Sequence, residues 1–240
     1  MLRIGIPYRY IDQDILDYLQ ACGFKLGERN PRKFSVKCSS PRCVIYTVNS
    51  TMLPDLLEEG LIDLAILPSV DFREANTFTA PLAELDIPVG KLMLGVSKDL
   101  PIAPLKELPI KYILTRTPRL TKEFLERNRL KWKMRVLRGL TFSTFPLFGK
   151  EAGVVEYVRT GKTMADNGLV PIATVASSSV VLIAHPRKVH SPQVSRIKKM
   201  IVSAPLTGKP LLAANGQNAG AANAGEVLIY SQPVAPVVGK

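Results

Sequence analysis

The segment with the clearest chemistry runs from residue 153 to residue 169 and reads GVVEYVRTGKTMADNGL. An apolar run of the β type carries one acid, Glu156, towards the turn Thr160-Gly161-Lys162-Thr163. Backbone N–H groups, two hydroxyls and a lysine that meet at the start of a helix can bind a phosphate group. A nucleotide-binding P-loop would need a glycine where this chain has Glu156. The segment therefore predicts a phosphate-binding turn beside a carboxylate and excludes a P-loop.

The elements that must position this turn alternate between strand-like and helical patterns. We expect helices at residues 14–22, 54–59, 121–128 and 192–202, and strands at 2–6, 44–48, 64–67, 92–96, 112–114, 133–137, 154–158 and 180–184. Pro54 and Pro118 suit the first turns of helices, while Gly23 and Gly60 suit the positions where helices end. Such alternation predicts an α/β architecture with largely parallel sheets.

Four further segments are collinear with this turn and carry a resemblance to a known family. They are LRIGIP at residues 2–7, LLEEGLIDLAIL at 56–67, TRTPRLTKEFL at 115–125 and NGLVPIATVASSSVVLIAHP at 167–186. Together with the turn, they resemble the ATP phosphoribosyltransferase family, whose members catalyse the first step of histidine biosynthesis. The turn itself resembles the loop of that family which binds phosphoribosyl pyrophosphate. Collinearity from about residue 2 to about residue 203 carries more weight than any one short motif, because short motifs recur by chance.

The resemblance implies an α/β fold of the type II periplasmic-binding-protein kind, with two lobes and a cleft between them. The first lobe would hold residues 1–90 and 178–203, and the second would hold residues 91–177 with the phosphoribosyl-pyrophosphate-like loop. Residues 204–240 are rich in Gly, Ala, Asn and Pro, and we expect a flexible C-terminal tail there. This tail is too short for the regulatory domain of the family's long form, so the chain is similar to the short form.

The family transfers a phosphoribosyl group from phosphoribosyl pyrophosphate to ATP, with the help of Mg²⁺, and releases pyrophosphate. Its short form works with a regulatory subunit that resembles histidyl-tRNA synthetase. By this resemblance Glu156, which stands where the family has Asp, would be the catalytic acid that orients the ribose hydroxyls. The residues implied to bind the substrates are Thr160, Gly161, Lys162, Thr163, Arg9, Lys91 and Arg116.

Other charged positions of the family's cleft are replaced in this chain. The family's Gly-Ser-Val-Glu segment aligns with residues 140–143, which lack the glutamate, and an arginine before its second helix aligns with Asn49. Scaffold residues persist while cleft charges change, so an active transferase and a catalytically degenerate homologue, or pseudoenzyme, both stay open. In the second case the turn would be an inherited structural turn, or the cleft would serve a small-molecule sensor.

The basic residues offer a separate hypothesis. The 240-residue chain has a formal net charge of +12, and residues 111–138 alone hold ten Lys and Arg against two Glu. Residues 25–42 and 187–199 are also basic. A polyphosphate substrate accounts for part of this charge. A degenerate homologue could use the rest to bind RNA within a ribonucleoprotein assembly, through Arg127, Arg129, Lys131 and Lys133. A solvated face without a partner is the third interpretation.

The cysteines and the apolar runs bear on metal binding and on location. Cys22, Cys38 and Cys43 do not stand at a metal-site spacing with His185 or His190, which predicts reduced thiols and no metal site. Every apolar run falls short of the ~20 residues that a membrane span needs. A strand that begins at residue 2 leaves no room for a signal peptide. We therefore expect a cytoplasmic protein, or one of an organelle matrix if a targeting segment is removed from a precursor.

Overall fold

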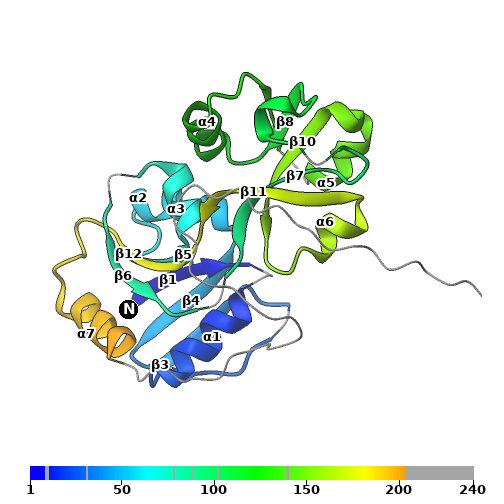
Figure 1. Ribbon diagram of the computed structural model, residues 1–240. Helices are drawn as coiled ribbons and strands as arrows, with labels where there is room; N and C mark the ends of the chain where they lie inside the picture. The colour runs from blue at the N-terminus through cyan, green and yellow to red at the C-terminus, as the bar shows by residue number, and fades with distance from the viewer. Residues whose placement is uncertain are drawn as a thin grey trace, which may run out of the picture. The chain divides into compact units, whose positions relative to one another are not determined.

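The computed structural model describes residues 1–8, 11–30, 32–77, 79–87, 89–101, 103–138 and 141–203 (Figure 1). The described chain forms two compact units, of which one holds Met1–Gly90 with residues 177–203 and the other holds Lys91–Ala176. Each unit is built around one β-sheet with helices on both faces. The predicted tail at residues 204–240 lies outside the described residues.

The first unit contains a seven-stranded sheet in the order β2-β3-β4-β1-β5-β12-β6. These strands are β1 (Leu2–Pro7), β2 (Lys25–Leu26), β3 (Ser35–Ser40), β4 (Cys43–Val48), β5 (Leu64–Pro68), β6 (Pro81–Leu85) and β12 (Val180–Ala184). The central strand β1 is parallel to both β4 and β5. The remaining pairs, β2–β3, β3–β4, β5–β12 and β12–β6, are antiparallel.

Helices cover both faces of this sheet, because its central strands bury apolar side chains on each face. Leu64 and Ile66 of β5 pack in one core with α1 (Asp12–Ala21) and α7 (Pro192–Val202). The alternate residues Ala65 and Leu67 pack in the opposite core with α2 (Leu53–Glu58). Figure 1 shows α1 and α7 on one face, and α2 with α3 (Ser69–Ala75) on the other.

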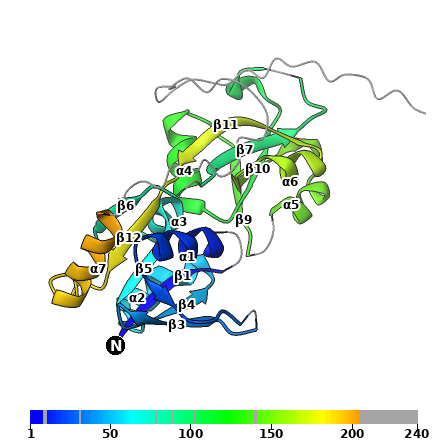
Figure 2. The same ribbon diagram turned by 90° about the horizontal axis from the view of Figure 1, so that it is seen from below.

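The second unit contains a five-stranded sheet in the order β11-β7-β10-β8-β9. These strands are β7 (Lys91–Ser97), β8 (Tyr112–Thr115), β9 (Lys133–Val136), β10 (Ala152–Val158) and β11 (Leu169–Ser177). The strands β8, β9 and β10 are parallel, whereas β7 is antiparallel to β10. The views from two directions agree that α4 (Pro118–Arg127) lies on one face, and that α5 (Thr141–Thr144) and α6 (Lys162–Asp166) lie on the other (Figures 1 and 2).

The sheets are mixed, which corrects our expectation that they are largely parallel. A short turn after β3 turns the chain back into β4, so these strands pair antiparallel. The sequence pattern did not predict β3 because the sequence of this strand, SVKCSS, is mostly polar. It also missed α3, which is only 7 residues long. The helices and strands that were predicted are all present, with ends displaced by a few residues.

The three cysteines are buried free thiols. Cys38 lies directly opposite Cys43 in the β3–β4 pair. Burial, with the neighbouring Cys38, raises the pKa of Cys43 to about 12, so this thiol stays protonated at neutral pH. Within the described residues there is no group of three or more His, Cys, Asp or Glu side chains that could hold a metal ion. The helices of the described chain are all too short or too polar to cross a membrane.

Candidate functional site

The carboxyl ends of three parallel strands meet at one edge of the five-stranded sheet. Thr115, the last residue of β8, is in register with Val136 at the end of β9 and with Val155 near the end of β10. Antiparallel β7 begins at the same edge, where Lys91 is in register with Val158. Ligands of α/β proteins bind at this edge of parallel strands, beyond their carboxyl ends. We call it the carboxyl edge of the second unit.

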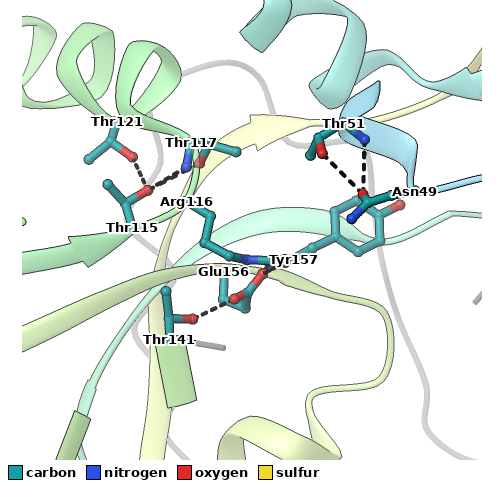
Figure 3. Close-up of polar contacts among 9 residues, drawn as sticks. All are labelled: Asn49, Thr51, Thr115, Arg116, Thr117, Thr121, Thr141, Glu156 and Tyr157. Atoms are coloured by element: carbon teal, nitrogen blue, oxygen red, sulfur yellow. Dashed lines mark hydrogen bonds and ion pairs between the residues drawn. The ribbon is translucent and has the colours of Figure 1, made fainter. Parts of the chain in front are cut away.

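Glu156 is a buried acid on β10 at this edge, with 7% of its surface exposed. Its Oε1 atom accepts a hydrogen bond from Arg116 Nη2 at 2.8 Å and another from the backbone N–H of Tyr157 at 3.0 Å (Figure 3). Its Oε2 atom accepts a hydrogen bond from the hydroxyl of Thr141, the first residue of α5. A buried carboxylate is costly unless it is paired and hydrogen-bonded, and these three donors meet that requirement.

The pairing of Arg116 with Glu156 joins two of the residues that the sequence placed in the site. Their side chains differ in access, because Arg116 is 44% exposed and Glu156 is 8% exposed. The guanidinium therefore reaches solvent while the carboxylate lies beneath it. In this arrangement the two charges compensate each other, and both oxygens of the carboxylate already accept hydrogen bonds.

A cluster of threonine hydroxyls holds the segment that carries Arg116. The hydroxyl oxygen of Thr115 accepts a hydrogen bond from the backbone N–H of Thr117 at 2.9 Å and lies 2.8 Å from the hydroxyl of Thr121 in α4. Thr115 and Thr121 are fully buried. These bonds fix the connection between β8 and α4, so Arg116 leaves the strand in a defined direction (Figure 3). Sequence analysis did not identify this cluster, although the repeated threonines of TRTPRLT were a visible signal.

The turn at residues 160–163 follows β10 and begins α6. Gly161 adopts a φ of 78° in the left-handed region, where a side chain would be strained. The backbone N–H of Ala165 donates to the carbonyl of Gly161 at 2.9 Å, which closes the first helical turn. Within the described chain, the hydroxyl of Thr163 and the backbone N–H groups of Thr163 and Met164 donate to no protein acceptor. The turn therefore presents unused hydrogen-bond donors.

Two lysines lie at or near this turn. Lys91 is paired in register with Val158, near the end of β10, and Lys162 is the first residue of α6. Both are exposed, and neither side chain forms an ion pair or hydrogen bond with another described residue. Their charges are available to an anionic ligand at the carboxyl edge. Arg9, the remaining cation that we expected in the site, lies outside the described residues.

The residues of the RNA hypothesis lie at the end of α4 and on the edge strand β9. The guanidinium of Arg127 lies over the Phe124 ring, 5.8 Å from its centroid, so this cation is packed against its own helix. Arg129 has a φ of 54° just past the helix. Together with Lys131 and Lys133 it is exposed. Arg129, Lys131 and Lys133 form no ion pair with the described acids.

A family model and individual sequence relatives of this chain carry the same description. A family model described as ATP phosphoribosyltransferase (HisG) matches residues 50–203. The ATP phosphoribosyltransferase of Thermosynechococcus vestitus is 29% identical over 191 residues, which cover 78% of this chain and 90% of the relative. The enzyme of the same name from Sulfurisphaera tokodaii is 23% identical, over 83% of this chain and 70% of the relative.

Solved structures of similar fold come from two groups of proteins. The ATP phosphoribosyl transferase (HisG:HisZ) complex from Thermotoga maritima matches with a TM-score of 0.64 at 17% identity, over 84% of this chain and 99% of that one. The alkanesulfonate-binding protein SsuA from Xanthomonas axonopodis bound to MOPS matches with a TM-score of 0.58 at 14% identity, over 85% and 72%. These matches confirm the predicted α/β fold of the type II periplasmic-binding-protein kind.

Proposed function

Because this chain belongs to the ATP phosphoribosyltransferase family, we propose that it transfers the phosphoribosyl group of phosphoribosyl pyrophosphate to ATP in histidine biosynthesis. The observation that carries this proposal is the turn at residues 160–163, whose unused N–H and hydroxyl donors follow the strand that carries the buried Glu156. Such a turn suits the 5′-phosphate of the sugar. In this reaction N1 of ATP attacks the anomeric carbon of the ribose, and pyrophosphate leaves.

Stabilisation of the leaving pyrophosphate is the main electrostatic demand of this reaction, because negative charge builds up on it in the transition state. Lys91 and Lys162, whose side chains have no acidic partner in the described chain, are the cations that we propose for this role. Arg116 is a third cation for this role, through an exchange of partners at Glu156. We propose that the ribose hydroxyls take the place of Arg116 at the Glu156 carboxylate, and that the freed guanidinium then contacts the pyrophosphate.

The fit of Mg²⁺ can be judged from the donors around Glu156. Both oxygens of this carboxylate already accept hydrogen bonds from Arg116, Tyr157 and Thr141, and among the described residues it belongs to no group of three or more His, Cys, Asp or Glu side chains. The protein groups therefore do not form a magnesium site by themselves. Mg²⁺ keeps several waters and binds readily to substrate phosphates. We propose that it enters as the complex of phosphoribosyl pyrophosphate, with no step assigned to a protein ligand.

A regulatory subunit is part of this proposal. The structural relative from Thermotoga maritima was solved as a HisG:HisZ complex. We propose that this chain likewise works with a separate subunit that resembles histidyl-tRNA synthetase. Activity assays should therefore include such a subunit, since the chain alone would show low turnover without it.

Binding can be tested separately from turnover. Phosphoribosyl pyrophosphate at a hundredfold excess over its dissociation constant should stabilise the fold by about 2.7 kcal/mol, which raises the melting temperature by roughly 5 to 10 °C for a chain of this size. The variant Lys162→Glu should lose this rise because it places a negative charge at the turn. The matched variant Lys106→Glu, on the distant segment η2 (Leu105–Glu107), should keep it. Differential scanning fluorimetry measures both, and an unchanged rise in Lys162→Glu would contradict phosphate binding at the turn.

A degenerate homologue that binds RNA is a second candidate, favoured by Arg129, Lys131 and Lys133, which are exposed and form no ion pair with the described acids. If this second hypothesis is correct, the chain should bind RNA with little sequence preference. The logarithm of its affinity for RNA should then fall steeply with the logarithm of salt concentration. Changing Arg127, Arg129, Lys131 and Lys133 to Ser should reduce this slope by about 3 units, at most one for each phosphate contact.

The control for this test removes equal charge from the other unit. It changes Lys25, Lys37, Arg187 and Lys198, which are all exposed, to Ser. Filter binding over a series of salt concentrations measures both slopes. Equal slopes for the two variants would show a general charge effect, and an absence of RNA binding near physiological salt would exclude this second candidate.

A further inference from the structure

A basic pocket of about 710 Å³ lies in the first unit, at the end of the sheet where the parallel strands β1, β4 and β5 begin. It is lined by residues of β1, of the turn before β4, of the segment before β5, and of α7 with the loop that precedes it. These residues include Leu2, Arg3, Arg42, Asp63, Lys188 and Arg196. The register of Leu2 with Cys43, the first residue of β4, places two of these strand starts side by side. We call this hollow the amino-edge pocket.

The only acid that lines the pocket is already neutralised within the described chain. Arg3 donates to Asp63 through Nε at 3.2 Å and through Nη2 at 3.1 Å, and its backbone N–H donates to the same carboxylate at 2.8 Å. Arg3 Nη2 also donates to the carbonyl of Gly60 at 2.7 Å, which fixes the guanidinium. Burial opposes ionisation of Asp63, but the bonds and charge of Arg3, with a contribution from Lys188, lower its pKa, so the acid stays charged at neutral pH.

The other three cations of the pocket have no ion-pair partner within 4 Å among the described acids. Arg42, Lys188 and Arg196 are exposed, and none of them forms an ion pair or a side-chain hydrogen bond with a described residue. With Arg3 and Asp63 included, the lining holds four cations and one carboxylate, which leaves a net charge of three positive. Three unpaired cations around one concave surface repel each other and attract an anion. Salt bridges within the fold do not account for their convergence.

The start of α7 adds donors to the same pocket. Ser191 caps this helix by accepting a hydrogen bond from the backbone N–H of Val194 at 3.3 Å. Gln193, in the first turn, lines the pocket, and its backbone N–H meets no acceptor among the described residues. Arg196 lies one turn further along, beside the buried Ile197 that anchors this helix face. An anion here would meet an arginine, an amide side chain and the positive end of an 11-residue helix.

We propose that the amino-edge pocket binds a small molecule that carries at least two phosphate groups, at a site separate from the carboxyl edge of the second unit. The volume lies within the range of small-molecule sites and is too small for a folded partner. Arginine forks match phosphate oxygens, and three unpaired cations suit more than one phosphate group. Leu2, Pro41 and Ile197 supply an apolar wall for the rest of such a ligand. This proposal does not depend on the proposed transferase activity.

The test measures pyrophosphate binding by equilibrium dialysis at low salt, with the full chain carrying Lys162→Glu so that the carboxyl-edge turn does not contribute. The double variant Arg42→Ser, Arg196→Gln should weaken this binding at least tenfold, since each charge-assisted contact contributes strongly. The control Lys37→Ser, Lys198→Gln removes two exposed cations of the same unit that do not line the pocket. It should weaken the binding clearly less than the pocket variant does, because these two side chains do not line the pocket and act on a ligand there only through long-range charge.

Three outcomes would overturn the proposal. They are no binding at millimolar pyrophosphate, an equal loss in the control variant, and binding of an acidic peptide in place of pyrophosphate. All four substituted side chains are exposed and form no ion pair or hydrogen bond with a described residue, so melting temperatures should stay unchanged and confirm that the variants are folded. Binding that persists in the Lys162→Glu parent also separates this site from the proposed active site.

Discussion

Replacing Thr160 and Thr163 together with alanine is expected to abolish the release of pyrophosphate from ATP and phosphoribosyl pyrophosphate. The hydroxyl of Thr163 and the nearby N–H groups have no acceptor in the described chain, so a bound phosphate would be their partner. A hydrogen bond to a charged group is worth about 1.5 to 3 kcal/mol, so the loss of two bonds to the 5′-phosphate predicts a fall of about 10² to 10⁴-fold in kcat/KM. A coupled pyrophosphate assay with Mg²⁺ and a supplied regulatory subunit measures this loss.

The matched control for this prediction changes the same two residues to serine. Serine keeps both hydroxyls, so Thr160→Ser with Thr163→Ser should retain most of the activity, and both pairs should melt at similar temperatures because both positions are exposed. Full activity in the alanine pair would show that the turn does not hold the substrate phosphate. If the unaltered chain releases no pyrophosphate beside a validated regulatory subunit, the proposed activity itself is wrong.

The sequence predicted the strands and helices well because they depend on local pattern. The continuous apolar runs of β5 and β12 and the amphipathic pattern of α7 are each visible within about ten residues of sequence. The parallel or antiparallel sense of each strand pair is not local. It depends on which strands meet across the sheet, which is why the mixed character of both sheets escaped the sequence analysis.

The sequence predicted which residues belong to the candidate site, but not how they contact one another. Arg116 and Glu156 were both assigned to substrates, and their mutual ion pair was not foreseen because it joins positions 40 residues apart. The pair depends on β8 lying beside β10, which a pattern search does not reveal. The amino-edge pocket escaped the sequence analysis for the same reason. Arg42 and Arg196 belong to two separate basic segments of the chain, and only the fold brings them to one pocket.

Substitution of Glu156 by Gln is expected to have the second large effect, on stability as well as on rate. The change removes the charge that Arg116 and Thr141 bind inside the unit. Breaking a fully buried pair costs about 3 to 5 kcal/mol, and because Arg116 is 44% exposed we expect a smaller loss of about 2 kcal/mol in the free energy of unfolding. Urea unfolding measures this loss. The exposed pair of Lys111 and Glu151 is the control, and Glu151→Gln should leave the free energy of unfolding nearly unchanged because solvent screens this pair.

A double-mutant cycle with Arg116→Gln then separates the structural role of Glu156 from its proposed role at the ribose. If Glu156 only holds Arg116, the double variant should lose little more stability than the worse single variant, and activity per folded molecule should fall only as far as Arg116→Gln lowers it. If Glu156 also orients the ribose hydroxyls, Glu156→Gln should lower kcat by about 100-fold or more beyond the loss in Arg116→Gln.

Because the exchange of partners frees Arg116 for the pyrophosphate, Arg116→Gln itself should lower kcat more than it lowers the affinity for phosphoribosyl pyrophosphate. Equal kcat values for Arg116→Gln and the double variant would contradict a direct role of the carboxylate and leave Glu156 as a positioning residue for the arginine.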